Sequence, residues 1–239
     1  MTEWYEHWFG EAYLDLYPHR DDADAARIVA LLHDRAWVRS GDLVLDLACG
    51  AGRHVEALAA SGGRVVGFDL SLAMLRAAQR RARAGLVRGD MRAIAFAASR
   101  FDVVVNLFTS FGYFERDEDH RAVLREVARI LRPGGRFVLD FLNAPAVRRG
   151  LVRRDSREIG GRRVVQERQL SEDGRFVAKT IALEGEGRHF LERVRLYERA
   201  DLERMLREAG MPVESVFGDY DGGAHAAESA RLLLIARRA

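Results

Sequence analysis

The sequence predicts an α/β fold: a doubly wound, mostly parallel seven-stranded sheet of the Rossmann-like kind, with an inserted antiparallel β segment. Short apolar runs alternate with helical patterns over the first two-thirds of the chain, which indicates right-handed βαβ crossovers. Stretches typical of strands, separated by hairpin-turn residues, follow within 145–199. We therefore predict one domain over 1–239, with an N-terminal segment at 1–21 and the insertion at 145–199.

Helix and strand patterns alternate as far as residue 142. Residues 22–37 begin with acidic side chains and then place Ile28, Leu31 and Leu32 at helical spacing, which predicts an amphipathic helix. Short apolar runs predict buried strands, and Pro133-Gly134-Gly135 is typical of a stop after a helix. The predicted strands are 43–47, 64–69, 85–90, 101–108 and 136–142, and the predicted helices are 22–37, 53–60, 72–83 and 117–131.

The pattern changes after Pro145. Turn-forming residues at 160–161, 171–174 and 184–187 divide the segment 151–199 into four β-like stretches, which predicts an antiparallel meander. The rest of the chain predicts a helix over 200–209 that ends at Gly210, then strands over 213–220 and 231–237 joined by a glycine-rich loop at 221–229.

Composition excludes several classes of function. The 239 residues contain 38 Lys and Arg against 36 Asp and Glu, so no strong field attracts nucleic acid or anionic lipid. The lone cysteine, Cys49, cannot form an internal disulfide, and no Cys/His cluster has the spacing of a metal site. The N-terminus lacks a signal pattern, and no apolar run approaches the ~18 residues of a membrane span. We expect a cytoplasmic protein without a membrane partner, and its oligomeric state stays open.

Residues 44–53, Val-Leu-Asp-Leu-Ala-Cys-Gly-Ala-Gly-Arg, carry the strongest chemical signal. Asp46 ends a buried strand, small residues follow, and a helix begins, so backbone N–H groups can approach a ligand closely. A second strand ends in Asp69, about twenty residues further on. A dinucleotide site would need glycine in place of Val55, and Asp46 would repel a pyrophosphate. An acidic residue instead suits a ligand with an ammonium and a sulfonium group, as in S-adenosylmethionine.

Five segments in order resemble the motifs of class I S-adenosylmethionine-dependent methyltransferases, in particular the small-molecule enzymes of the sugar-amine type. The resemblance covers residues from about 13 to 143, and Ala48 stands where many members have glycine. The matching segments are Asp46-Leu-Ala-Cys-Gly-Ala-Gly52, Val-Val-Gly-Phe-Asp69, Gly89-Asp90-Met91, Phe101-Asp-Val-Val-Val-Asn-Leu-Phe108 and Leu131-Arg-Pro-Gly-Gly-Arg136.

The resemblance implies how S-adenosylmethionine is held. Asp69 and the adjoining Leu70 would bind the ribose, while the Asp90 side chain and the Met91 backbone would bind the adenine. The methionine end would lie against the glycine loop, the fourth motif and the N-terminal segment, which acts as a lid in related enzymes. The residues implied there are Asp46, Ala48, Gly50, Gly52, Asn106, Phe108, Tyr17 and Arg20. A plainer explanation for Asp46 and Asp69 is that each caps the helix after its strand.

Three surrounding segments are predicted to form the acceptor pocket: the aromatic-rich N-terminal stretch 4–20, residues 109–113 and the last strand of the meander. Thr109-Ser-Phe-Gly-Tyr113 resembles a segment of sugar-amine N-methyltransferases. This suggests Tyr113 as the catalytic residue, which would either orient the acceptor or hydrogen-bond to it, beside Ser110. Strand alternation places arginine and tyrosine side chains of the last meander strand on one face. The other candidates are Tyr13, Arg193, Arg195, Tyr197 and Tyr220. Core packing of the aromatic residues and a solvated sheet face are the plainer alternatives, and His120 is expected to be a solvated helix residue.

The predicted reaction is S-adenosylmethionine-dependent methyl transfer to N or O of a small-molecule acceptor by in-line displacement, without a metal. A catalytically silent protein that binds S-adenosylmethionine is an alternative, and a nicotinamide-dependent oxidoreductase is disfavoured by Val55 and Asp46. A nucleic-acid acceptor is disfavoured because Leu-Phe-Thr follows Asn106, where amino-methylating DNA enzymes have Pro-Pro and an aromatic residue.

Overall fold

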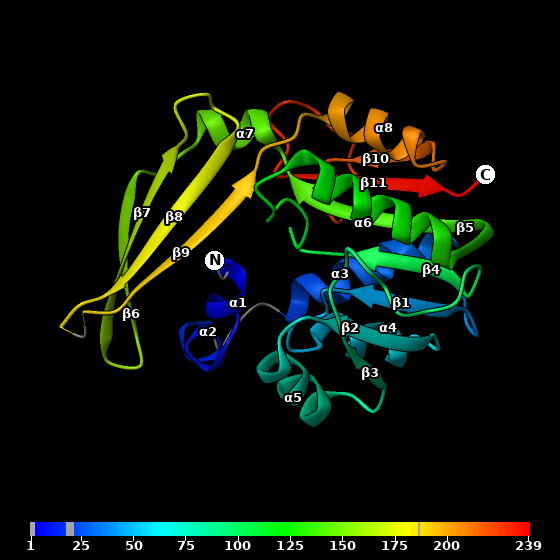
Figure 1. Ribbon diagram of the computed structural model, residues 1–239, viewed down its shortest axis with the longest axis horizontal. Helices are drawn as coiled ribbons and strands as arrows, with labels where there is room; N and C mark the ends of the chain where they lie inside the picture. Colours follow the sequence, from blue (N-terminus) through cyan, green and yellow to red (C-terminus); the bar gives the residue numbers. More distant parts are fainter. Residues whose placement is uncertain (1–2, 18–21, 186) are drawn as a thin grey trace.

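The computed structural model describes residues 3–17, 22–185 and 187–239. Seven strands form one sheet in the order β10-β11-β5-β4-β1-β2-β3 (Figure 1). All neighbouring pairs from β5 to β3 are parallel, whereas β11 is antiparallel to both of its neighbours. This topology confirms the predicted fold class. The strands are β1 (Leu43–Leu47), β2 (Arg64–Asp69), β3 (Gly85–Arg88), β4 (Phe101–Asn106), β5 (Leu131–Leu142), β10 (Val213–Phe217) and β11 (Arg231–Arg237).

Helices cover both faces of this sheet because consecutive strand residues point to opposite sides. Val44 packs with the face covered by α3 (Asp22–Asp34), α4 (Arg53–Ala60) and α5 (Leu72–Arg81). Its neighbour Leu45 packs with the face covered by α6 (Asp117–Ile130) and α8 (Arg199–Glu208). The strand order reverses between β1 and β4, which is where sheets of this kind bind ligands at their carboxyl ends.

A second, antiparallel sheet lies beside the carboxyl ends of the main strands (Figure 1). Glycines with positive φ form the turn after its first strand, at the position where the turn-forming residues in the sequence predict a hairpin. Two short helices lie between the two sheets, and Trp8, Tyr13 and Leu16 pack there against Val164 and Ile181. The elements are β6 (Arg154–Ile159), β7 (Arg162–Leu170), β8 (Phe176–Leu183), β9 (His189–Arg195), α1 (Trp4–Trp8) and α2 (Glu11–Leu16).

Some boundaries differ from the prediction. A short helix, α7 (Ala144–Arg149), was not predicted; its proline lies in the first turn, where no backbone N–H is needed. The first long helix ends at Asp34 rather than at residue 37, and Ala36 has φ 55°. Strand β4 ends at Asn106 because Phe108 and Thr109 adopt positive φ angles.

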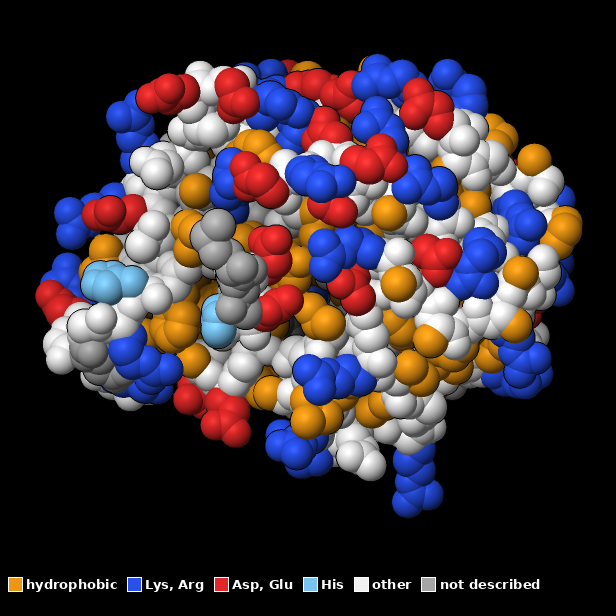
Figure 2. Space-filling view, viewed as in Figure 1, with side chains coloured by type: hydrophobic (Ala, Val, Ile, Leu, Met, Phe, Trp, Pro, Cys, Tyr) orange, Lys and Arg blue, Asp and Glu red, His pale blue; other side chains and the backbone are white. Residues whose placement is uncertain are grey.

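Charges of both signs are interspersed over the surface, as Figure 2 shows for one face. Arginines pair with nearby carboxylates in many places, and such exposed pairs contribute little to stability individually. Among the residues that the structure describes, no helix is long and apolar enough to cross a membrane.

A buried polar network joins the end of β9 to the start of α6. The Tyr197 hydroxyl lies 2.8 Å from Asp117 Oδ1 and 3.0 Å from His120 Nδ1, while the Phe114 N–H donates to His120 Nε2 at 3.2 Å. Because Nε2 accepts, the neutral ring carries its proton on Nδ1. Burial lowers the pKa of His120 to about 4, against the opposing effect of Asp117. The expectation that His120 is a solvated helix residue was therefore wrong; its side chain is buried.

This burial makes stability depend on pH. Between pH 6.5 and about 4 the unfolded chain binds a proton at His120 that the folded protein does not, so the free energy of unfolding falls as the pH falls. Replacing His120 by Gln should reduce this dependence by about 1.4 kcal/mol per pH unit in that range, measured by urea unfolding. His189→Gln, at an exposed position, is the matched control. An unchanged slope in H120Q would contradict the assignment.

Candidate active site

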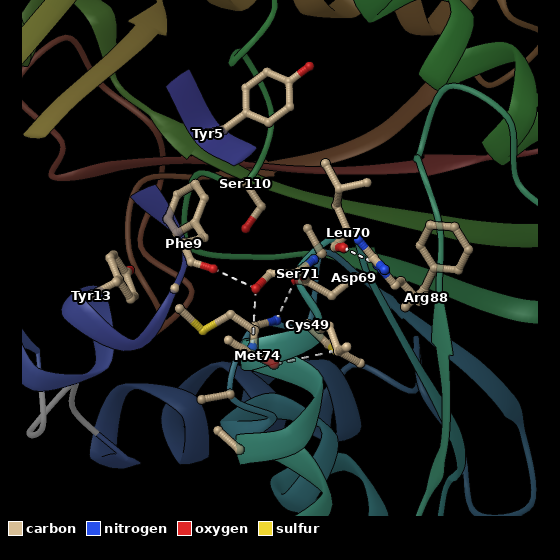
Figure 3. Close-up of a pocket in the computed structure, with 18 of the residues that line it drawn as sticks. Tyr5, Phe9, Tyr13, Cys49, Asp69, Leu70, Ser71, Met74, Arg88 and Ser110 are labelled. Carbon is tan, nitrogen blue, oxygen red and sulfur yellow. Dashed lines mark hydrogen bonds between the residues drawn. The ribbon is translucent and has the colours of Figure 1, made fainter. Parts of the chain in front are cut away.

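A cavity of about 970 Å³ opens at the carboxyl ends of β1, β2 and β4, beneath α1 and α2. Figure 3 shows side chains from both sides of it: Phe9 and Tyr13 from the N-terminal helices, and Asp69, Leu70 and Ser71 from the end of β2. Many of the predicted residues line this space. They are Tyr13, Tyr17, Ala48, Gly50, Asp69, Leu70, Asp90, Met91, Phe108, Ser110 and Tyr113.

Three further predicted residues, Asp46, Gly52 and Asn106, are not part of the cavity wall but lie in or next to the segments that form it. Asn106 is fully buried, and its Nδ2 donates to the Leu47 carbonyl at 2.9 Å, which ties β4 to β1. Gly52 has φ 83°, and a Cβ there would come within 2.8 Å of the Ala78 Cβ, so the site requires glycine. Arg20 lies outside the described residues.

The loop after β1 presents its backbone to the cavity. Ala48 and Gly50 both have positive φ angles, and the Ala48 and Cys49 N–H groups donate to the Phe68 carbonyl. The Cys49 side chain is buried and fills the space above Gly67, where a Cβ would come within 2.9 Å of the Cys49 sulfur. Burial raises the pKa of the Cys49 thiol, so this residue is a packing group rather than a nucleophile.

The Asp46 carboxyl is almost fully buried, and its Oδ2 has no hydrogen-bond partner within the described chain. Burial, and secondarily the nearby Asp69 charge, raise the pKa of Asp46 to about 7, against the opposing effect of Arg53. A buried carboxylate of this kind is stabilised by a cationic group placed beside it. The observation fits the ammonium end of S-adenosylmethionine.

Asp69, at the end of β2, connects the glycine loop to the next turn. Its Oδ2 accepts from the Gly50 N–H and its Oδ1 from the Ser71 N–H, both at 2.8 Å. Burial raises the pKa of Asp69, and these backbone N–H groups oppose that rise. Each carboxylate oxygen retains a further lone pair on a group that lines the cavity, which suits the hydroxyls of a ribose.

Asp90 lies at the far end of the cavity wall. A side-chain nitrogen of Arg92 donates to Oδ2 of Asp90 at 2.6 Å, and the backbone N–H of Arg92 donates to Oδ1 at 2.8 Å. Burial raises the pKa of Asp90, but the bonds from Arg92 outweigh that effect and hold it below its usual value. The carboxylate therefore stays ionised and can still accept a hydrogen bond.

Aromatic side chains form the wall opposite the carboxylates. The Tyr113 ring is stacked on Phe9, with 5.5 Å between ring centroids, and on Tyr5 at 6.5 Å. The Ser71 hydroxyl donates to the Phe9 carbonyl at 2.5 Å, which links this wall directly to the turn beside Asp69 (Figure 3). Aromatic rings and carboxylates therefore face a single space.

The second sheet holds the two N-terminal helices in place. The Trp8 Nε1–H donates to Glu192 at 2.8 Å, and the Lys179 ammonium lies 3.0 Å from the Tyr17 hydroxyl. Lys179 and Glu192 also pair with each other at 2.5 Å. One ion pair of the sheet thus contacts both α1 and the end of α2.

Four residues predicted for the acceptor pocket do not line the cavity. Arg193 pairs with Glu115, and Arg195 donates to Asp117 at 3.0 Å, as part of the network that includes Tyr197. Tyr220 donates to Asp140 at 2.6 Å. The prediction for these residues is corrected. Strand alternation gave the shared face of Arg193, Arg195 and Tyr197, but acidic partners from other elements occupy that face. Tyr220, predicted from its place beside the C-terminal loop, bonds to Asp140 instead.

Sequence reasoning missed several residues of the wall. Tyr5, Phe9, Phe114 and Arg53 line the cavity, and Ser71 both caps α5 and bonds Phe9. The cluster of aromatic residues before position 20 was the available signal for Tyr5 and Phe9. Within the described residues, no group of three or more His, Cys, Asp or Glu is arranged to hold a metal ion.

Comparison with known proteins identifies the family. The profile of the methyltransferase-domain family matches residues 44–135. The chain is 33% identical over 216 residues to a cypemycin N-terminal methyltransferase from a Streptomyces species, covering 85% of this chain and 88% of that protein. It is also 33% identical over 211 residues to the dTDP-3-amino-3,4,6-trideoxy-α-D-glucopyranose N,N-dimethyltransferase of Streptomyces venezuelae, covering 84% and 87%.

A solved structure shows the same relation in three dimensions. CalS10 from Micromonospora echinaspora, an amino pentose methyltransferase solved with bound S-adenosylmethionine, superposes with a TM-score of 0.70 at 25% identity, covering 96% of this chain and 97% of that one. Neither alternative, the oxidoreductase or the catalytically silent protein, finds support in these relatives. The chain belongs to the S-adenosylmethionine-dependent methyltransferases.

Proposed function

We propose that this methyltransferase modifies the nitrogen of a small-molecule amine, held between the aromatic wall and the methyl group of S-adenosylmethionine. The single observation that carries the proposal is the continuous cavity of about 970 Å³, which joins Asp69 and Asp90 to the rings of Tyr113 and Phe9. Its volume suits a cofactor together with a compact acceptor. Two relatives named as methyltransferases of an amino sugar and of a peptide N-terminus support nitrogen as the acceptor atom.

In this proposal each of three carboxylates is assigned to a different part of S-adenosylmethionine. Asp69 accepts from the ribose hydroxyls beside Leu70, and Asp90 with the Met91 backbone receives the adenine. The buried Asp46 faces the positive methionine end through the Ala48–Gly52 loop, and Tyr17 and Arg20 belong to the same end. S-adenosylmethionine supplies a methyl group on a sulfonium, whose sulfur leaves as a neutral thioether.

The residues on the acceptor side of the cavity act by positioning the amine. Because the sulfonium is a good leaving group, the protein has mainly to hold the nucleophile in line with the methyl. Tyr113 is fixed by stacking on Phe9 and by its carbonyl, which accepts from Trp4 Nε1 at 3.3 Å. In this proposal Tyr113, with Ser110 and Tyr13, orients the amine, and the aromatic wall favours its uncharged, nucleophilic form.

Two further parts of the proposed function are the class of acceptor and the cellular location. A net charge of +2 and the absence of Pro-Pro and an aromatic residue after Asn106 support a small-molecule acceptor in preference to nucleic acid. We propose a cytoplasmic enzyme, on the single buried cysteine.

Asp69→Asn tests the ribose contact. The substitution halves the acceptor capacity of a side chain that must serve two backbone N–H groups and the ribose, so we expect the Kd for S-adenosylmethionine to rise 10- to 100-fold, about 1–3 kcal/mol, by calorimetry. Asp102→Asn is the matched control, because Asp102 also accepts a backbone N–H, that of Leu43 at 2.7 Å, but lies outside the cavity. Equal affinities for wild type and D69N would refute the contact.

The pKa of Asp46 gives a pH-dependent binding test. Below pH 7 the free protein holds a proton on Asp46, and the cationic cofactor favours the ionised form, so binding should release that proton. The affinity for S-adenosylmethionine should therefore fall as the pH falls below 7, by up to about tenfold per pH unit. Calorimetry at pH 6 in buffers of different ionisation enthalpy measures the proton release. Asp46→Asn should abolish it, and equal release from wild type and D46N would rule out this role.

A further inference from the structure

The turn that follows β4 has an unusual backbone. Phe108 and Thr109 adopt φ angles of 57° and 62°, in the left-handed region. An aromatic residue and a β-branched residue rarely adopt this conformation, and two in succession persist only when neighbouring groups hold them there. The conformation matters because Phe108 and Ser110 both line the cavity.

Asp140, a fully buried residue of β5, contacts this turn twice. Its Oδ2 accepts from the Phe108 N–H at 2.7 Å, and its own carbonyl accepts from the Thr109 N–H at 3.0 Å. Both N–H groups of the left-handed residues therefore end on a single amino acid. Asp140 itself does not line the cavity.

Two residues from the C-terminal part of the chain hold Asp140 in turn. The Tyr220 hydroxyl donates to Oδ2 at 2.6 Å, and the Arg231 Nε–H donates to Oδ1 at 2.8 Å. Arg231 also donates to the Thr109 hydroxyl at 2.9 Å, so it binds both the aspartate and the turn. Tyr220 and Arg231 stand on opposite sides of the 221–230 loop, which Asn143 secures by donating to the Ser229 carbonyl at 2.7 Å.

The turn places Phe108 and Ser110 in a fixed arrangement at the cavity wall. The Arg53 guanidinium lies over the Phe108 ring, 4.1 Å from its centroid, and the Ser110 hydroxyl donates back to the Leu107 carbonyl at 2.9 Å. A change in the φ angles at 108 and 109 would move Phe108 and Ser110 together. The positions of Phe108 and Ser110 in the cavity wall therefore depend on hydrogen bonds made outside the cavity.

We propose that Asp140, Tyr220 and Arg231 form a positioning clamp: they hold the Phe108–Thr109 turn in its left-handed conformation and thereby fix Phe108 and Ser110 at the reacting end of the cavity. The clamp residues act through the turn and do not touch the cofactor. The inference rests on the proposed function in one respect, the placement of Phe108 beside the methionine part of S-adenosylmethionine.

The test compares two buried hydroxyls. Tyr220→Phe removes one hydrogen bond of the clamp, whereas Tyr197→Phe removes buried bonds to Asp117 and His120, which do not belong to the clamp or the turn. We expect Y220F to raise the Kd for S-adenosylmethionine about fivefold, the effect of one typical hydrogen bond, and Y197F to change it less than twofold. Amide exchange, measured without ligand, should accelerate at Phe108 and Thr109 in Y220F alone.

A double-mutant cycle separates positioning from general stability. Glycine at 109 adopts the left-handed conformation without strain, so Tyr220→Phe should cost less affinity in a Thr109→Gly background than in wild type. Arg231→Lys, which keeps the charge but loses a donor, is measured alongside in case Y220F fails to fold. Unchanged exchange at Phe108 together with unchanged affinity in Y220F and R231K would overturn the clamp. If wild type fails to bind S-adenosylmethionine, the cofactor assignment fails, and the exchange data alone decide the clamp.

Discussion

Two loops meet at the reversal of strand order, and each is held by an aspartate on the next strand outward. Asp69 of β2 accepts the Gly50 N–H of the loop after β1, and Asp140 of β5 accepts the Phe108 N–H of the turn after β4. Both loops contain non-glycine residues with positive φ angles, Ala48 in one and Phe108 and Thr109 in the other, a conformation that neighbouring groups must hold. Carboxylates at the ends of neighbouring strands therefore bind the backbone of both loops, and both loops line the cavity.

The two aspartates differ in what else they can bind. Asp69 lines the cavity and keeps lone pairs for a ligand, whereas Asp140 is enclosed by Tyr220 and Arg231 and serves only the protein. In the roles that we propose, the same interaction gives a binding residue on one side of the crevice and a positioning residue on the other. The second sheet completes the site, because its Lys179–Glu192 pair holds α1 and α2 above the opening.

The fold and the glycine-containing loop after β1 could be predicted because their signals are local. Strand periodicity, the small residues after Asp46 and the spacing to Asp69 lie within short segments, and the structure brings those segments together. The acceptor side depends on partners far apart in the chain. Nothing near Tyr220 in sequence indicates Asp140, 80 residues away, and nothing near His120 indicates Tyr197, 77 residues away. In these cases the residue type alone could not indicate the buried partner, and that partner decides where the side chain lies.

The central claim is that the cofactor lies across β1, β2 and β4 with its ribose on Asp69. A crystal structure of the protein with S-adenosylhomocysteine, the neutral product of methyl transfer, tests this most directly. We predict both ribose hydroxyls within hydrogen-bond distance of the Asp69 carboxylate and the sulfur beside Phe108. A ribose bound elsewhere, with Asp69 bonded to the Gly50 and Ser71 N–H groups and to no atom of the ligand, would contradict the account.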